Sequence, residues 1–152
     1  TGEQCLPAGQ SRQHQGAVAD AGMTLYTVGS IKRIPGYKQY AAVDGGMTDN
    51  PRYALYQSRY TVYHGSKTGP TERFDVVGRC CESGDIIQPH VELPADTCRG
   101  DILAVCTTGA YNYSMASNYN RLPRPPIVML TPEGSYTAVR RETFADLTAL
   151  DE

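Results

Sequence analysis

The stretch that decides the fold is VADAGMTLYTVGSIKRI, residues 18–34, followed after Pro35-Gly36 by YKQYAAVD, residues 37–44. Both segments are rich in Val, Ile, Tyr and Thr, which favour β-strands, and a Pro-Gly pair is a strong turn signal. The pattern therefore predicts two strands joined as a hairpin.

Five further short segments have the same character and are separated by loops. They are RYTVY (59–63), RFDVV (73–77), DILAV (101–105), PIVML (126–130) and SYTAVR (135–140). The last two flank TPEGS, whose Pro132 and Gly134 predict a second hairpin. Only NPRYALYQ, near 50–57, and ETFADLTALDE, over about 142–150, resemble helices. The second places Phe144, Leu147 and Leu150 three apart, as an amphipathic helix does.

Many short strands with few helices indicate a mainly β fold. We expect an antiparallel, Greek-key-type barrel or sandwich with a few short helices, including a C-terminal one. The chain has 152 residues, enough for one domain with its own core. The pair Gly45-Gly46 is not part of a longer glycine-rich motif. A tight turn with positive φ is therefore favoured over a phosphate-binding loop.

Composition excludes several classes of function. A net charge of −2 provides no basic surface for nucleic acid. No apolar run reaches the roughly 18 residues of a membrane span. Residues 1–16 are polar and lack the cationic start and apolar stretch of a signal peptide, so we expect a loose tail and a cytoplasmic protein.

The cysteines follow no disulfide or zinc pattern. There are five, Cys5, Cys80, Cys81, Cys98 and Cys106, with no C-x-x-C pair, and the three histidines are scattered. We therefore expect reduced thiols and no metal site. Tyrosine is unusually frequent, at 11 against 2 Phe and no Trp, which favours an interface or a polar pocket over an oily interior.

Three local patterns carry candidate chemistry, each with a plain structural alternative. In Cys81-Glu82, the thiol could deliver a proton and the carboxylate could hold an ammonium. Alternatively, the cysteine is a small core residue and the glutamate is solvated. Arg52 and Tyr56 lie one helical turn apart and suit a carboxylate, or are a surface Arg and a packed Tyr. Residues 109–120, GAYNYSMASNYN, line a polar site or form an exposed loop.

Taken in order, four segments resemble the C-terminal half of the diaminopimelate decarboxylases. They are VDGGMTDNPRYALY (43–56), CCESGD (80–85), GAYNYSMASNYN (109–120) and NRLPRPPIVML (120–130). That family comprises pyridoxal-phosphate-dependent enzymes with an N-terminal (β/α)₈ barrel and a C-terminal β-domain. The resemblance implies that residues 17–152 are the β-domain and that residues 1–16 are unmatched, a tag or a truncated-gene sequence.

The resemblance also implies roles for individual residues. The family's Cys-Glu-Ser-x-Asp motif matches Cys81 to Asp85, so Cys81 would donate a proton to the carbanion left by decarboxylation. Glu82 would hold the distal ammonium of the substrate. Arg52 and Tyr56 match the family's substrate-binding Arg-x-x-x-Tyr, and Tyr111 would contact both cofactor and substrate.

The implied reaction converts meso-2,6-diaminopimelate to L-lysine and CO₂ with pyridoxal 5'-phosphate as the electron sink. In the family, the residues matching Cys81 and Glu82 enter the active site of the partner subunit, which implies a homodimer. Related ornithine-type enzymes carry aspartate where this chain has Glu82, and that difference favours diaminopimelate over diamine-forming chemistry.

The chain departs from the family at its front. The family's Glu-Pro-Gly-Arg motif is absent, and the place reads RQHQGAVADAG (12–22). The barrel that carries the cofactor lysine and the phosphate loop is absent too, and Lys32, Lys38 and Lys67 lie in no matching context. We expect the chain to be inactive alone and to self-associate, either through an unpaired sheet edge or through the native dimer surface.

Three alternatives stay open on the sequence. The chain is the C-terminal part of a diaminopimelate decarboxylase completed by a cognate barrel, or a standalone β-domain for dimerisation or protein binding with vestigial site residues, or part of a decarboxylase for another basic amino acid. An adjacent reading frame encoding the barrel would favour the first.

Overall fold

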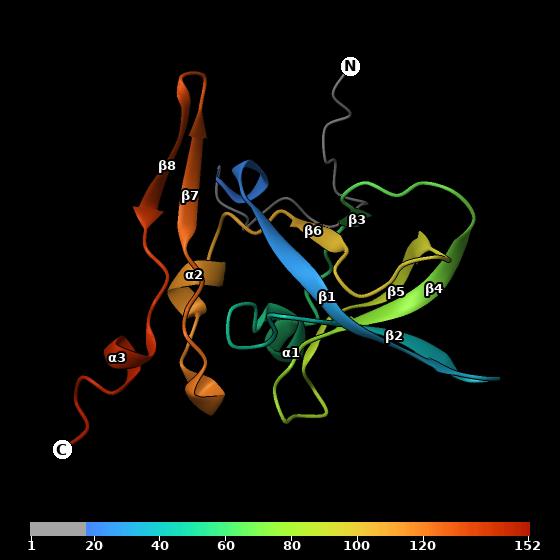
Figure 1. The fold of residues 1–152 in the computed structure, drawn as a ribbon, viewed down its shortest axis with the longest axis horizontal. Coiled ribbons are helices and arrows are strands. Elements are labelled where there is room, and N and C mark those ends of the chain that lie inside the picture. Colours follow the sequence, from blue (N-terminus) through green and yellow to red (C-terminus); the bar gives the residue numbers. More distant parts are fainter. Residues whose placement is uncertain (1–17) are drawn as a thin grey trace.

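A six-stranded sheet that curves into a nearly closed barrel forms the body of the molecule (Figure 1). The computed structural model describes residues 18–152. The sheet contains β1 (Met23–Ile34), β2 (Lys38–Val43), β3 (Val62–His64), β4 (Thr71–Val77), β5 (Ile86–Pro94) and β6 (Ile102–Cys106), in the order β3-β6-β1-β2-β4-β5. The prediction of a mainly β fold with few short helices is confirmed.

β1 joins the two halves of the barrel. Its first part, Met23–Thr27, pairs antiparallel with β6, and its second part pairs antiparallel with β2, with an irregularity between Val28 and Ser30. The predicted hairpin is confirmed, with its turn at Pro35-Gly36, and Gly36 adopts the positive φ of 72° that such turns need. One long strand thus carries the chain around the barrel.

The sheet is mixed, so the expected antiparallel arrangement holds for four of its five strand pairs and not for the fifth. β2 pairs with β4 in parallel, with Ala41 opposite Val76. The two strands are not joined by a tight turn, because α1 (Arg52–Tyr56) and β3 lie between them in sequence. The Greek-key connectivity stays a prediction.

β5 was not predicted, because its sequence IIQPHVELP contains two prolines. Proline is tolerated at a sheet edge or a bulge, where its missing N–H costs no ladder hydrogen bond. β5 is an edge strand, and its register with β4 shifts near Pro89 and His90. The His90 N–H donates to Asp75 Oδ1 at 2.9 Å instead of to the ladder.

The core lies inside the barrel and draws on every strand of the six-stranded sheet. It comprises Tyr26, Val28, Ala41, Val43, Val62, Phe74, Val76, Ile87, Val91, Leu93, Leu103 and Val105. A side chain helps to close the gap between the edges, since Gln88 Oε1 on β5 accepts from the backbone N–H of Tyr60 just before β3, at 2.8 Å. The closed core holds the loops between strands in fixed places.

The C-terminal part forms a separate arm of the molecule, drawn in orange to red in Figure 1. It contains α2 (Asn112–Met115), η2 (Tyr119–Arg121), the predicted hairpin of β7 (Ile127–Thr131) and β8 (Gly134–Val139), and α3 (Phe144–Leu147). Near the start of the described chain, η1 (Ala19–Ala21) precedes β1, where the sequence indicated strand.

The C-terminal helix is shorter than predicted. α3 has four residues, and Phe144 and Leu150, predicted for an apolar face, are 76% and 95% exposed. Its beginning is fixed instead by a capping box, in which the Thr143 side chain accepts from Asp146 N and Asp146 accepts from Thr143 N. Capping sets where this helix starts.

Candidate functional site

The loop between β4 and β5, residues 78–85, carries the Cys-Cys-Glu-Ser sequence and is anchored by Asp85. The Asp85 carboxylate is 4% exposed and accepts from the backbone N–H groups of Met47 and Cys80, each at 2.6 Å. Asp85 therefore connects this loop to the loop that precedes α1 and contains Gly45 and Gly46, called the glycine loop below. The sequence analysis named Asp85 only as part of a motif, and its structural role was missed.

Glycines surround this carboxylate for reasons of space. A Cβ built on Gly46 or Gly78 would lie 2.6 or 2.3 Å from an Asp85 carboxylate oxygen, and one on Gly45 would lie 2.2 Å from the Tyr26 ring. None of the three has a positive φ among the described residues. A turn begins at Gly46, whose carbonyl accepts from the Asp49 N–H at 3.1 Å, whereas Gly45 lies before it. Close approach of neighbouring side chains, and not positive φ, requires glycine at both positions.

Cys81 and Glu82 face outward from the anchored loop, and both are exposed. Two residues of the polar segment hold them: Tyr119 Oη donates to Glu82 Oε1 at 2.5 Å, and the Cys81 N–H donates to Asn120 Oδ1 at 3.3 Å. Cys80 is only partly exposed, and burial, followed by the nearby Asp85, raises the pKa of its thiol. The accessible thiol of the pair is thus Cys81.

Arg52, Tyr56 and Tyr111 form a second cluster at α1. The Arg52 guanidinium carbon lies 5.6 Å from the centre of the Tyr56 ring and 5.1 Å from that of Tyr111, and its Nη1 is 4.0 Å from Met115 Sδ. Tyr56 is 61% exposed and Tyr111 is 50% exposed. An arginine flanked by two aromatic faces is held in place and keeps N–H groups for a carboxylate.

Buried polar side chains lie close to this cluster, and the sequence analysis did not single them out. Asn50 and Asn112 are 1% and 5% exposed, and their amide atoms make no hydrogen bond to another described residue. Burial raises the pKa of Tyr60, while nearby Asn112 and Arg52 act to lower it. Buried amides among apolar strands signal a specific polar environment next to Arg52.

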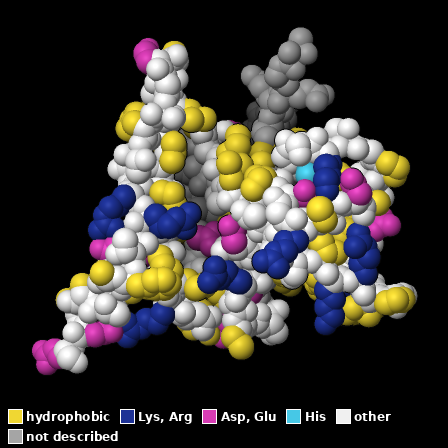
Figure 2. All heavy atoms as spheres, in the orientation of Figure 1, with side chains coloured by type: hydrophobic (Ala, Val, Ile, Leu, Met, Phe, Trp, Pro, Cys, Tyr) yellow, Lys and Arg dark blue, Asp and Glu magenta, His cyan; other side chains and the backbone are white. Residues whose placement is uncertain are grey.

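The polar segment 109–121 contributes to both clusters. Tyr111 and Met115 lie against Arg52, while Tyr119 and Asn120 lie against the Cys81-Glu82 pair. It is also tied to the glycine loop, since the Ser117 N–H donates to Thr48 O at 2.8 Å. Figure 2 shows acidic side chains between the β7–β8 hairpin and the barrel, with basic side chains beside them.

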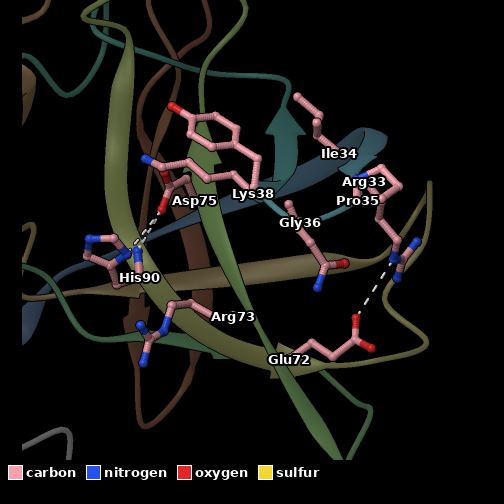
Figure 3. Close-up of a pocket in the computed structure, with 11 residues that line it drawn as sticks. Arg33, Ile34, Pro35, Gly36, Lys38, Glu72, Arg73, Asp75 and His90 are labelled. Atoms are coloured by element: carbon pink, nitrogen blue, oxygen red, sulfur yellow. Dashed lines mark hydrogen bonds and ion pairs between the residues drawn. The ribbon is translucent and has the colours of Figure 1, made fainter.

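A depression of about 710 Å³ lies away from both clusters, at the tip of the β1–β2 hairpin against β4 and β5 (Figure 3). Its charged side chains are paired: Lys38 Nζ lies 2.7 Å from Asp75 Oδ2, and Arg33 Nε lies 3.8 Å from Glu72 Oε2. None of the predicted site residues lines it. Lys67 is also paired, with Asp101 at 2.7 Å.

The structure corrects the expectation for one thiol. Cys80, Cys81 and Cys98 are free, whereas Cys106, at the end of β6, is disulfide-bonded, so the prediction of reduced thiols is wrong for Cys106. Within residues 18–152, no group of three or more His, Cys, Asp or Glu is arranged to hold a metal ion. No helix in that range is long and apolar enough to cross a membrane.

Comparison with known proteins gives a consistent result. The chain is 50% identical over 136 residues to the diaminopimelate decarboxylase of Bacillus subtilis, which covers 88% of this chain and 31% of that protein. It superimposes on the M. jannaschii diaminopimelate decarboxylase in co-complex with L-lysine with a TM-score of 0.84 at 36% identity, over 88% of this chain and 30% of that one.

The Helicobacter pylori diaminopimelate decarboxylase complexed with L-lysine matches with a TM-score of 0.81 at 32% identity, over 88% of this chain and 32% of that one. The chain thus spans about a third of the length of the relatives it matches. The family model described as "Pyridoxal-dependent decarboxylase, C-terminal sheet domain" matches residues 17–109, well over half of the chain. The chain therefore belongs to the pyridoxal-dependent decarboxylases, as a member with their C-terminal sheet domain.

Proposed function

We propose that residues 17–152 are the C-terminal β-domain of a cytoplasmic diaminopimelate decarboxylase, which converts meso-2,6-diaminopimelate to L-lysine and CO₂. An N-terminal (β/α)₈ barrel would complete the site. One observation carries this proposal: the structure gathers all five predicted residues into two exposed clusters joined by one polar segment. The relatives at about 50% identity, all named diaminopimelate decarboxylase, support the choice of reaction.

The two clusters suit the two charged groups at the distal end of this substrate. Its distal end carries a carboxylate and an ammonium, which call for a cation and an anion in fixed places. Arg52 provides the cation, positioned between Tyr56 and Tyr111. Glu82 provides the anion, exposed on an anchored loop.

Cys81 is the candidate acid of the reaction. Its thiol is free and exposed, so it can reach a substrate carbon that has lost CO₂ and deliver a proton to it. Cys80 is partly buried beside Asp85 and is therefore less accessible than Cys81. The match of Cys81 to the family's proton donor agrees with this difference in access.

Tyr111 is the residue of this chain that fits pyridoxal 5'-phosphate. Its ring is half exposed and its backbone adopts an unusual φ of 70°, a conformation that costs energy and is typical of functional positions. The cofactor, when bound, withdraws the electrons released by loss of CO₂. The lysine and the phosphate loop that hold it would come from the barrel, since Lys38 and Lys67 are engaged in ion pairs away from Tyr111.

A homodimer would divide the two clusters between its two active sites. Cys81 and Glu82 would enter the site of the partner subunit, while Arg52, Tyr56 and Tyr111 would serve the site of their own subunit. Large apolar side chains also lie exposed on the outer face of the sheet, including Met23 at 61%, Leu25 at 63% and Tyr63 at 50%. Such a surface is typical of one that is covered in an assembly.

The test is a chimera in which this chain replaces the C-terminal third of the Bacillus subtilis relative. We expect it to release CO₂ from meso-diaminopimelate and to form L-lysine, with little activity on ornithine or lysine. The chain alone should release none and should form no borohydride-reducible adduct with pyridoxal phosphate. Preference for ornithine or lysine would instead favour the third alternative of the sequence analysis. A folded, dimeric chimera without activity would favour a standalone binding domain.

A further inference from the structure

Tyr119 and Asn120 lie directly against the two residues proposed to act on the substrate. The Tyr119 hydroxyl donates to Glu82 Oε1 at 2.5 Å, a short distance typical of a hydrogen bond to an anion. The backbone N–H of Cys81 donates to Asn120 Oδ1 at 3.3 Å. Consecutive residues of one segment therefore contact consecutive residues of the other.

The backbone at this contact adopts an uncommon conformation. Asn120 and Arg121 have φ values of 55° and 54°, in the left-handed region. Asn tolerates that region, whereas Arg does so at a cost, so the surrounding structure must hold it. Asn118 Nδ2 donates to Glu142 Oε2 at 2.6 Å on one side, and Arg121 Nη1 donates to Leu147 O at 3.1 Å on the other. The segment is anchored at both ends.

We propose that Tyr119 and Asn120 are positioning residues, which hold the Glu82 carboxylate and the Cys81 backbone in the geometry that the substrate requires. This inference rests on the proposed function and extends it to residues outside the Cys-Glu motif. Glu82 and Cys81 are exposed on a loop, and an exposed glutamate otherwise samples many rotamers. One hydrogen bond from a rigid phenol removes much of that freedom before substrate arrives.

The electrostatics of the pair agree with this role. The hydrogen bond to Glu82 raises the pKa of the Tyr119 phenol, followed by smaller contributions from burial and from the negative charge of Glu82. The phenol therefore stays a proton donor through the neutral range. The second oxygen of Glu82 is left for the ammonium of a substrate.

The first test uses the chain itself, labelled at the tyrosine Cζ for NMR. We expect Glu82→Gln to lower the pKa of Tyr119. The Cζ chemical shift of Tyr37, at the tip of the β1–β2 hairpin, should stay the same at neutral pH and is the control. An unchanged Tyr119 pKa in Glu82→Gln would show that the hydrogen bond does not form in solution, and it would overturn the inference whatever the enzyme does.

The second test is a double-mutant cycle in the active chimera described above. Tyr119→Phe should raise KM for meso-diaminopimelate about 3- to 10-fold, as the loss of one exposed hydrogen bond to a charge would, with a smaller change in kcat. In a Glu82→Gln background the same substitution should have no further effect, because Tyr119 acts through Glu82. Tyr37→Phe is the matched control and should change neither constant.

Asn120→Gly isolates the second contact, because glycine keeps the left-handed backbone while removing the acceptor for Cys81 N. We expect a lower kcat with KM nearly unchanged, and Asn120→Asp, which retains an acceptor oxygen, should recover most of the loss. If the unsubstituted chimera has no activity on meso-diaminopimelate, the proposed function fails. If it is active and Tyr119→Phe is silent, or equally harmful in both backgrounds, the positioning role fails alone.

Discussion

At the scale of single residues, the difference in exposure between Cys80 and Cys81 decides which of the two adjacent thiols is assigned the role of proton donor. Adjacent cysteines are indistinguishable by residue type, and the sequence separates them only through the motif that begins at Cys81. The structure separates them physically: Cys81 is exposed, and Cys80 is partly buried beside Asp85. The two criteria agree on Cys81.

Replacement of Cys81 in the chimera provides the corresponding test. Cys81→Ala should lower kcat by about 10²- to 10⁴-fold, the usual contribution of a general acid, with a small effect on KM because the proton is needed only after CO₂ leaves. Glu82→Gln should raise KM as well, since it removes a charge that holds the bound substrate. Steady-state kinetics measure both.

Cys80→Ala is the control for that experiment and should be nearly silent. A loss of activity confined to Cys80→Ala would mean that the motif is misaligned by one residue. If neither cysteine variant is impaired, the proton comes from another group, and the role given to Cys81 is wrong.

The five predicted site residues were identified from the order of motifs along the sequence. The contacts that these residues make could not be predicted in the same way. Tyr119, Asn120 and Asp85 act through hydrogen bonds across 37, 39 and 38 positions of sequence, respectively, and local sequence patterns carry no information about such contacts. Only the unusual polarity of residues 109–120 signalled that this segment has a specific environment. Only the structure shows that one part of this segment contacts Arg52 and another part contacts Cys81 and Glu82.

At the scale of elements, Asp85 holds two loops together and should matter for stability more than for chemistry. Asp85→Ala leaves the N–H groups of Met47 and Cys80 without an acceptor in a buried place. We expect the free energy of unfolding to fall by about 2 to 3 kcal/mol. Urea denaturation of the chain measures this change.

The matched control is Asp96→Ala, because the Asp96 side chain is 74% exposed and its closest cation, Lys67, lies 4.0 Å away. Its effect should stay within about 0.5 kcal/mol. Equal effects of the two substitutions would show that Asp85 does not anchor the loops.

A second prediction at the scale of elements concerns the ion pair between Arg124 and Glu142, which flank the β7–β8 hairpin in sequence. Arg124 hydrogen-bonds Glu142 through Nε at 2.7 Å and, with smaller contributions from its backbone N–H and Asn118, lowers the pKa of Glu142 from 4.5 to about 2. A carboxyl whose pKa is lowered by folding stabilises the fold above its unfolded pKa, and this stability is lost as the pH falls toward the folded pKa.

Glu142→Gln should therefore be less stable than the natural chain above pH 4.5, and the difference should shrink as the pH falls from about 4.5 toward 2. Thermal unfolding followed by circular dichroism at several pH values measures it. In an Arg124→Gln background, the difference between Glu142 and Gln should depend much less on pH. A difference that grows on acidification would have the wrong sign and would refute this account.

The strands show which elements sequence patterns can predict. Segments rich in β-branched and aromatic residues were found, including both hairpins, because their turns carry Pro and Gly. β5 was missed because Pro89 and Pro94 are normally signs against a strand, and only its edge position with a bulge makes them harmless. α2 was missed because four residues leave no periodicity to detect.

At the scale of the whole molecule, the class of fold was predictable and the sheet topology was not. The count of short strands indicated a barrel or sandwich, and a curved, nearly closed barrel-like sheet is present. The parallel pairing of β2 with β4 depends on where the intervening α1 and β3 return the chain. Local sequence patterns do not encode that return path.

The central claim is that one chain supplies Arg52 to its own site and Cys81 to the site of its partner. Subunit complementation between two inactive chimeras, Arg52→Ala and Cys81→Ala, tests it most directly. Mixed and allowed to exchange subunits, they form heterodimers with one intact and one doubly impaired site, so we predict recovery of about a quarter of the unsubstituted activity on meso-diaminopimelate. Heterodimers that form but show no recovered release of CO₂ would contradict the claim.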